Sequence, residues 1–408
     1  MQTFRAADAK QVADVVTWAA AEEQPLEIVG GGSKRGLGRL TQVEHRLDVS
    51  SMAGISAHEP GELVLTAAAA TPLTDIERAL EAERQMLAFE PPDWRALLGA
   101  ETCTPTLAGV ISCNLAGPRR VSAGAARDHL LGFHAVNGRG EAFKSGGKVV
   151  KNVTGYDLSK LVCGAYGTLC VLTELSIKVL PRPETACTLL VLGLDDTAGV
   201  AALSTALGSS HEVSAAAHLP LNIARRSTVR AVSGAGASVT ALRIDGPAPS
   251  VTFRKEKLAA LLRSHGQVEM IDGQDSQVFW WDIRDVLFFS GDIARAVWRI
   301  SVAPSQGPAV AVDLTRHLDA EHFFDWEGGL LWITVDEKVI DGGADAVRTA
   351  VAAHGGGHAT LVRAPDTLRA AVPVFDPLAG PLAALTLRIK ESFDPRHILN
   401  PGRMYAGI

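Results

Sequence analysis

The sequence predicts an α+β protein built from more than one domain, and three observations indicate this class. The chain has 408 residues, which is enough for two or three folding units. Short apolar runs of strand length and amphipathic stretches of helical period both occur. In the second half, strand-like runs are separated by helices and long connections, which favours an antiparallel sheet covered on one face.

The first elements are predicted to be a helix followed by a strand. Val12, Val15, Val16 and Ala19 follow the i, i+3, i+4, i+7 spacing of one helical face, and Asp8 precedes them as a candidate N-cap. The apolar run 26–29 after Pro25 predicts a strand that ends in three glycines.

A second strand is predicted at 62–66, and a second helix runs to about residue 83. Thr71 is the expected cap of that helix, with Pro72 at its first position. Residues 91–127 are rich in small residues and lack periodicity, and such a long irregular stretch is usually functional. Asn137-Gly138, between two strand-like runs, predicts a hairpin.

A domain boundary is predicted at Pro181-Arg182-Pro183, where an apolar, β-rich run ends. We therefore expect a first domain at 1–182, a second at 183–375, and a segment at 376–408 that holds a helix and a proline-rich tail. In the second domain, strands are expected near 188–192, 239–244, 297–302, 330–335 and 360–362, and helices at 198–207 and 344–353.

Composition excludes several classes of protein. Hydrophobic residues make up 47% and charged residues 21%, as in soluble globular enzymes. The net charge is −6 and there is no basic block, so a nucleic acid is not an expected partner. The five cysteines contain no C-x-x-C pair, so the ligands of a zinc site or an iron–sulfur cluster are missing. Charged residues near the start and the lack of a long apolar stretch indicate a cytoplasmic protein.

The sharpest local motif is the glycine loop Gly30-Gly31-Gly32-Ser33-Lys34. Glycines after a strand let successive backbone N–H groups approach an anion, while Ser33 adds a hydroxyl and Lys34 a positive charge. This pattern indicates a pyrophosphate cradle, although a plain glycine-rich turn is the alternative. It is neither a Rossmann fingerprint nor a P-loop, because Arg35 occupies the place of the last Rossmann glycine and no G-x-x-x-x-G-K-[ST] occurs.

Three further motifs follow in order. They are T-L-A-G…N-L-A-G at 106–117, G-A-Y-G-T-L at 164–169 and the tail F-D-P…I-L-N-P-G at 393–402. Small residues in the first two offer a surface to a flat ligand, with Thr106, Ser112 and Asn114 as hydrogen-bonding groups. A closely packed turn region is the alternative interpretation of each.

Taken together, the four ordered motifs resemble the FAD-binding domain of the vanillyl-alcohol oxidase type, also called the PCMH type. The resemblance covers the first 182 residues and the tail. It implies two α+β subdomains that hold an extended FAD, and an α+β cap domain with an antiparallel sheet that closes over the flavin. Within this group the chain resembles the FAD-binding E subunits of glycolate oxidase, through the glycine loop and through 151–158, 297–302 and 359–364.

The resemblance also implies site residues. Gly30, Gly31, Gly32, Ser33 and Lys34 would cradle the FAD pyrophosphate. The flavin and ribityl would lie along Thr106, Gly109, Ser112 and Asn114, and the nucleotide would contact Gly164, Gly167 and the backbone of Cys170 and Val171. Relatives that attach flavin covalently have His where this chain has Ser33, so we expect non-covalent FAD. Tyr166 and Cys170 stand where many members have Glu and Gly.

Relatives that oxidise D-2-hydroxy acids carry an H-x-G-D-G-x-x-H metal motif in the cap, and this sequence does not contain it. His354-Gly355-Gly356-Gly357-His358 is the nearest string, but it lacks a carboxylate, so we expect no metal site. The resemblance therefore implies an FAD-holding oxidoreductase subunit of a complex that oxidises glycolate to glyoxylate. The expected partners are a paralogous FAD-binding catalytic subunit and an iron–sulfur subunit that accepts electrons from flavin, and the complex would place the chain at the periphery of the inner membrane.

Two arginines are weaker candidates for a small-molecule substrate. Arg299 and Arg363 lie in apolar strand patterns, where each would bind a substrate carboxylate or form a structural ion pair. Two other functions stay open: a self-sufficient FAD-dependent oxidoreductase for a 2-hydroxy acid or alcohol, and a degenerate, non-catalytic flavoprotein subunit.

Overall fold

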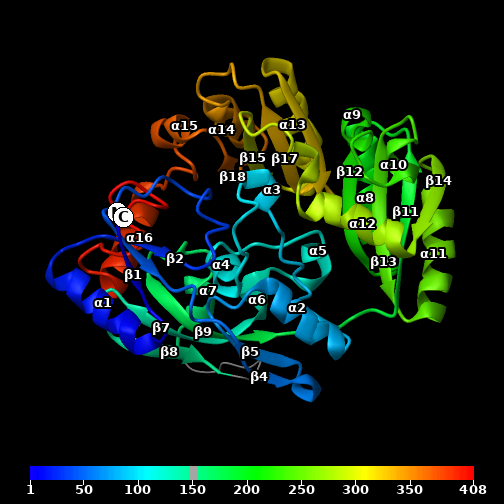
Figure 1. Ribbon diagram of the computed structural model, residues 1–408. Coiled ribbons are helices and arrows are strands. Elements are labelled where there is room, and N and C mark those ends of the chain that lie inside the picture. The colour runs from blue at the N-terminus through cyan, green and yellow to red at the C-terminus, as the bar shows by residue number, and fades with distance from the viewer. Residues whose placement is uncertain (148–154) are drawn as a thin grey trace.

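A computed structural model describes residues 1–147 and 155–408 of the chain. The part of the predicted motif at 151–154 therefore lies outside the described residues. Helices and sheets are mixed throughout, which confirms the α+β class. Figure 1 shows the segments before β10 at one end of the molecule and the strands from β11 onward at the other, and both views place the two termini at the same end.

The chain begins with a small parallel sheet of order β1-β3-β2, made of Gln2–Arg5, His45–Asp48 and Leu26–Val29. The helix α1 (Ala9–Ala21) packs beside it and buries Val12, Val16 and Ala19. The Asp8 side chain accepts a hydrogen bond from the Gln11 N–H at 2.8 Å, so the predicted N-cap is confirmed.

A second sheet follows, with order β4-β5-β9-β7-β8 and only antiparallel pairs. Its strands are Ile55–Glu59, Val64–Ala68, Cys170–Lys178, Leu130–Asn137 and Ala142–Gly146. The predicted hairpin at Asn137 is confirmed, because β7 pairs with β8 and the Asn137 side chain accepts hydrogen bonds from the N–H groups of Arg139 and Glu141. A short pair, β6 (Gln85–Met86) and β10 (Leu180–Pro181), lies beside this sheet.

The helix α2 (Leu73–Ala82) starts one residue later than predicted. Pro72 is its N-cap, and Thr71 does not cap it. Instead the Thr71 hydroxyl donates to backbone carbonyls of Ala68 and Gly54 and accepts from the Gly54 N–H, so it ties the end of β5 to the preceding loop. Shorter helices fill the rest of this part: α3 (Arg95–Leu98), α4 (Leu107–Ser112), α5 (Arg120–Ala123), α6 (Ala126–His129), α7 (Leu158–Val162) and the 3₁₀ turn η1 (Pro60–Glu62).

The remaining strands form one eight-stranded antiparallel sheet of order β14-β11-β13-β12-β16-β17-β15-β18. In that order they span Gln267–Asp272, Thr185–Leu192, Val239–Gly246, Val213–Leu219, Ala320–Asp325, Leu330–Val335, Ala296–Ser301 and His358–Arg363. All five predicted strands lie in it. The Ala-rich β12 was not predicted, because it is buried at all seven positions and so shows no alternation.

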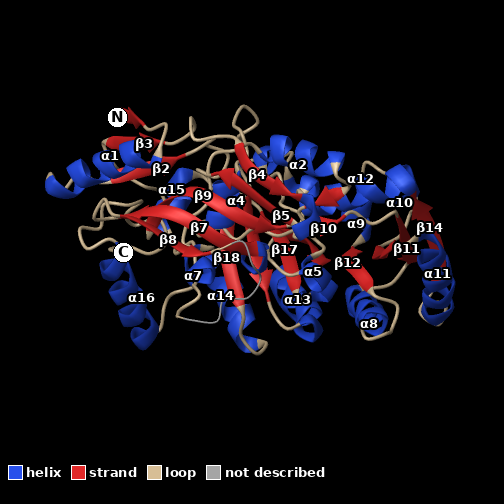
Figure 2. Ribbon diagram, turned by 90° about the horizontal axis from the view of Figure 1, so that it is seen from below, coloured by secondary structure: helices blue, strands red, loops and turns tan. Residues whose placement is uncertain are grey.

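Helices cover one face of this sheet (Figure 2). They are α8 (Asp196–Leu207), α11 (Ala248–Leu262), α13 (Gly307–His317) and α14 (Ala344–Ala353), of which α8 and α14 match the two predicted helices. The connections hold α9 (Leu221–Ala224), α10 (Arg230–Ser233), α12 (Gly273–Arg284), α15 (Asp366–Ala371), η2 (Leu287–Phe289), η3 (Pro304–Gln306) and η4 (Trp326–Gly328). The boundaries predicted after residues 182 and 375 stay predictions, although the change of sheet falls between β10 and β11.

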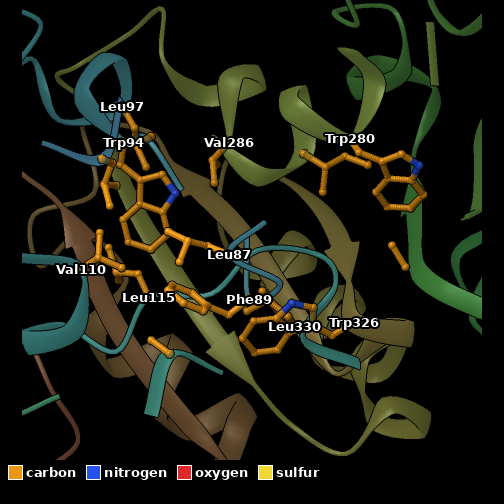
Figure 3. Packing of buried hydrophobic residues seen from close by; sticks show 14 of the residues in the cluster. Leu87, Phe89, Trp94, Leu97, Val110, Leu115, Trp280, Val286, Trp326 and Leu330 are labelled. Atoms are coloured by element: carbon orange, nitrogen blue, oxygen red, sulfur yellow. The ribbon is translucent and has the colours of Figure 1, made fainter. Parts of the chain in front are cut away.

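The other face of the large sheet packs on the first part of the chain. Figure 3 shows Phe89 and Trp94 in one hydrophobic cluster with Trp326 and Leu330 of the large-sheet region. Trp94 and Trp332 meet edge to face at 5.4 Å between ring centroids, and the Trp326 indole N–H donates to the Gly117 carbonyl at 3.1 Å. These contacts give the two regions one common core.

A buried charge network joins the same two regions. Arg119 and Arg243 both contact Glu90, at 3.2 and 2.9 Å, and both contact Asp245. Burial alone would raise the pKa of Glu90, but the two arginines lower it to about 2. Because an ordinary Glu titrates near 4.5, this network stabilises the fold above that pH, and its contribution is lost as the pH falls from about 4.5 to about 2.

The tail returns to the first part of the chain after α16 (Gly380–Phe393). Lys390 and Asp394 form an ion pair of 2.7 Å with 1% and 0% of their side chains exposed. The ammonium also donates to the carbonyls of Thr168 and Leu399, and the carboxylate accepts from the N–H groups of Ile398 and Leu399. This pair therefore fixes the residues that follow against β2 and β9.

Replacing Asp394 by Asn should destabilise the protein by about 3–5 kcal/mol, because it leaves the buried Lys390 charge without its partner. The measurement is urea unfolding followed by tryptophan fluorescence. Asp14→Asn is the matched control, since Lys10 and Asp14 form an exposed pair of the same i, i+4 spacing at 3.0 Å. Equal urea midpoints for the two variants would contradict the role given to the buried pair.

Candidate functional site

A cleft opens between the small parallel sheet and the five-stranded sheet. The glycine loop after β2 forms one wall, and α4 with the start of β9 forms another. The returning tail closes the third side through Asn400 and Arg403. Every lining residue that the structure describes belongs to 28–172 or to 400–403, so the region of the large sheet contributes none.

The conformation of the glycine loop requires glycine at positions 31 and 32. A Cβ on Gly31 would lie 1.9 Å from the Thr104 carbonyl oxygen, because the Thr104 N–H donates to the Gly31 carbonyl and brings the two segments together. Gly32 has a φ of +81°, which favours glycine. The loop is thus held tightly against residue 104 while it lines the cleft.

Two cations are buried in this cleft without an acidic partner among the described residues. Lys34 is 7% exposed, and its ammonium donates only to the Ser33 hydroxyl at 3.3 Å. Arg403, also 7% exposed, donates to the Lys34 carbonyl at 2.9 Å. Burial lowers the pKa of both side chains. Buried cations without a counter-ion are costly, so the donor set fits a bound anion such as a diphosphate.

The wall opposite the loop contains three of the predicted residues. Thr106 is the N-cap of α4, and its hydroxyl accepts from the Gly109 N–H at 3.4 Å. A Cβ on Gly109 would lie 3.1 Å from that hydroxyl, which keeps the wall flat. Ser112 also lines the cleft, and its carbonyl accepts from the Tyr166 N–H at 2.8 Å. This wall therefore has the small residues that a flat ring needs for close approach.

Of the other predicted residues, two line the cleft and two do not. Gly167 and Val171 line the cleft together with Cys170. Asn114 and Gly164 are absent from its lining and lie against each other, with a Cβ on Gly164 placed 3.3 Å from that of Asn114. The side-chain oxygen of Asn114 accepts from the Arg127 N–H, so it makes its hydrogen bond within the protein.

The two candidate substrate arginines have different surroundings. Arg363 donates to the backbone carbonyls of Arg295, Leu97, Phe289 and Asp292, so its guanidinium joins the two regions and its donors are already occupied within the protein. Arg299 lies 4.8 Å from the centroid of the Trp326 ring and has no ion pair in the part of the chain that the structure describes.

Each histidine of the 354–358 string lies beside a different aspartate. His354 contacts Asp313 at 2.6 Å, and His358 lies 3.7 Å from Asp376. The described residues contain no group of three potential metal ligands.

Sequence reasoning missed several residues of the cleft lining, among them the polar residues Asn400 and Arg403. The Asn400 side chain accepts from the Ile28 N–H at 2.8 Å and donates to the Tyr166 carbonyl at 2.9 Å, so it joins the glycine-loop strand to the opposite wall. The N-P-G tail motif marked this segment, but only the fold brings Arg403 to a loop that is 369 residues away in sequence.

Comparison with known proteins agrees with this cleft. A model of the FAD binding domain family matches residues 2–146. Glycolate oxidase subunit GlcE of Escherichia coli (strain K12) is 37% identical over 399 residues, 96% of each chain. Glycolate oxidase subunit GlcD of Bacillus subtilis (strain 168) is 38% identical over 118 residues, 29% of this chain and 23% of that protein. The solved structure of p-cresol methylhydroxylase with substrate bound has a TM-score of 0.68 at 14% identity, covering 98% of this chain and 88% of that one, which confirms the PCMH-type fold.

Replacing Lys34 or Arg403 by Gln should weaken FAD binding by about 10- to 150-fold each, since a hydrogen bond to a charged group contributes about 1.5–3 kcal/mol. The measurement is titration of the FAD-free protein with FAD, followed by flavin fluorescence. Lys160→Gln is the control, because that lysine is 58% exposed and lies outside the cleft lining. An unchanged affinity in both cleft variants would contradict the assignment.

The glycine loop itself can be tested with two alanine substitutions. Gly31→Ala should abolish FAD retention, because the new Cβ would overlap the Thr104 carbonyl oxygen. Gly36 follows the loop by two residues, and a Cβ there would make ordinary contacts of 3.6 Å with Leu98, so the Gly36→Ala variant should keep its flavin. Flavin absorbance per mole of purified protein is the readout, and equal retention by both variants would disprove the account of the loop.

Proposed function

We propose, from the premise that this chain belongs to the family of glycolate oxidase subunit GlcE, that it holds FAD non-covalently in the cleft as one subunit of a glycolate-oxidising complex. The complex would oxidise glycolate, a 2-hydroxy acid, to glyoxylate. Electrons would pass through flavin to an iron–sulfur partner. That the chain binds FAD follows from the FAD binding domain match and the relatives.

The observation that carries the proposal is the pair of buried cations beside the glycine loop, neither of which forms an ion pair with a described residue. In the proposed complex, the N–H groups of Gly30 to Lys34 donate to the FAD diphosphate, while Lys34 and Arg403 neutralise its charge. Thr106, Gly109 and Ser112 form the flat wall for the ring system, and Gly167 and Val171 complete the opposite side. FAD, when bound, supplies a two-electron acceptor that can also release single electrons.

The surroundings of the cleft support a division of labour between subunits. Its described lining comes entirely from 28–172 and 400–403, while the large-sheet region is joined to the first domain through an aromatic core. The sequence also lacks the H-x-G-D-G-x-x-H motif of relatives that oxidise D-2-hydroxy acids. We therefore place glycolate oxidation on a paralogous FAD-binding subunit.

The iron–sulfur clusters are assigned to a further polypeptide. The five cysteines have no cluster-binding spacing, and the structure describes all of them as free, with Cys163, Cys170 and Cys187 buried. Among the described residues, no helix is both long and apolar enough to cross a bilayer. Our proposal is that the chain is cytoplasmic and reaches the inner membrane through its partners.

The isolated chain should purify as a yellow protein that shows no glycolate-dependent dye reduction. Co-expression with a GlcD-type subunit and an iron–sulfur subunit should yield a complex that reduces the dye. The Lys34→Gln chain in the same complex should lower this activity if electrons pass through its flavin.

Each competing function has its own outcome in this experiment. Robust dye reduction by the isolated chain would contradict the division of labour and favour a self-sufficient oxidoreductase. A colourless chain that still supports full activity of the complex would favour a degenerate, non-catalytic subunit.

A further inference from the structure

Tyr166 is held in an unusual backbone conformation in the lining of the cleft. Its φ is +54°, in the left-handed region that residues other than glycine seldom adopt. Its N–H donates to the Ser112 carbonyl at 2.8 Å, and its carbonyl accepts from the Asn400 side chain at 2.9 Å. Such conformations persist only where the surroundings fix them, and they gather at ligand-binding sites. The backbone of Tyr166 is thus fixed between the flat wall and the tail.

The position of Tyr166 is next to the wall that we assign to the ring system of FAD. Ser112, to which its N–H is bonded, belongs to that wall. The Tyr166 hydroxyl makes no hydrogen bond with any residue that the structure describes. Burial raises the pKa of this phenol, so it stays protonated at neutral pH. Tyr166 therefore brings a neutral aromatic side chain to the place proposed for the flavin.

One aromatic residue from the region of the large sheet packs on Tyr166. Phe375 follows α15 and packs against the hydrophobic cluster between the large sheet and the helices α13 and α14. Its ring meets that of Tyr166 edge to face, with 5.1 Å between the ring centroids. The region of the large sheet supplies no residue to the described cleft lining, but it reaches the cleft through this contact.

An arginine of the same region fixes the segment that carries Phe375. Arg348, on α14, donates to the carbonyls of Pro373 and Phe375 at 3.0 and 2.9 Å. It forms an ion pair with Asp376 and donates to the Ala359 carbonyl of β18 at 3.0 Å. One guanidinium therefore ties residues 373–376 to α14 and β18, and this determines where the Phe375 ring meets Tyr166.

We propose that the Tyr166 side chain contacts the flavin of bound FAD and that Arg348 is a positioning residue, which holds Tyr166 there through Phe375. This inference rests on the proposed function, because it requires FAD in the cleft. An aromatic ring beside the flavin adds a favourable ring contact and excludes water from it. Many members of the family have Glu at this position, and Glu has no ring for such a contact.

Fluorescence of the bound flavin in the FAD-loaded full chain tests the contact. A tyrosine in contact with a flavin quenches its fluorescence, because the phenol donates an electron to the excited ring and receives it back. Phenylalanine does not quench, since its ring is much harder to oxidise. Tyr166→Phe should therefore raise the flavin fluorescence several-fold while FAD content stays the same. Tyr156→Phe is the matched control, because Tyr156 is 90% exposed and lies outside the cleft lining.

The positioning role of Arg348 is tested by a double-mutant cycle. Arg348→Gln should also raise the flavin fluorescence, because it frees Phe375 and loosens Tyr166. Combined with Tyr166→Phe, it should add no further rise, since Arg348 acts through Tyr166. Arg316→Gln is the control, because Arg316 lies on α13 of the same region with 65% of its side chain exposed. If Arg348→Gln fails to fold, Phe375→Leu takes its place, with the same expected result.

The outcomes separate this inference from the proposed function. A wild-type chain that holds no FAD would contradict the proposed function. A chain that holds FAD but has the same flavin fluorescence in Tyr166→Phe as in the wild type would overturn only the contact. A rise in the double variant equal to the sum of the two single rises would overturn the positioning role of Arg348.

Discussion

The buried positive charge of Lys34 and Arg403 is the constraint on which the rest of the site depends. Both side chains lie in the cleft beside the glycine loop, where Gly31 leaves no room for a Cβ. Neither has an acidic partner among the described residues. A protein that buries two such cations needs an anion to offset the loss of hydration. A dinucleotide diphosphate would neutralise this charge and accept hydrogen bonds from the backbone N–H groups of the glycine loop, which is why we assign the cleft to FAD.

The tail makes this arrangement possible although it is distant in sequence. The buried pair of Lys390 and Asp394 anchors the end of α16, and Asn400 then joins the glycine-loop strand to the opposite wall. Between the two parts of the chain that line the cleft, the strands β11 to β18 form a sheet with one face that shares a core with the first part of the chain. The region of the large sheet is thus packed against the first part of the chain, while the described cleft lining comes only from 28–172 and from the tail. This geometry agrees with our proposal of a subunit that holds FAD.

Local chemistry explains which features were predictable from sequence. The Asp8 cap of α1 and the Asn137 hairpin depend on residues within a few positions of one another. The glycine loop was predictable from its local run of glycines, although the contact that holds it, with Thr104, is distant in sequence. Thr71 was assigned to a helix cap, but tertiary contacts with Gly54 compete for its hydroxyl. The strand β12 gave no periodic signal because both of its faces are buried. The placement of Arg403 beside Lys34 and that of Arg299 beside Trp326 depend on contacts between distant segments, which no local pattern records.

The most direct measurement of the central claim is a crystal structure of the chain with FAD bound. The account predicts diphosphate oxygens within hydrogen-bonding distance of the backbone N–H groups at 30–34, with the Lys34 ammonium and the Arg403 guanidinium beside them. A diphosphate bound elsewhere, with both cations still facing an empty loop, would contradict it.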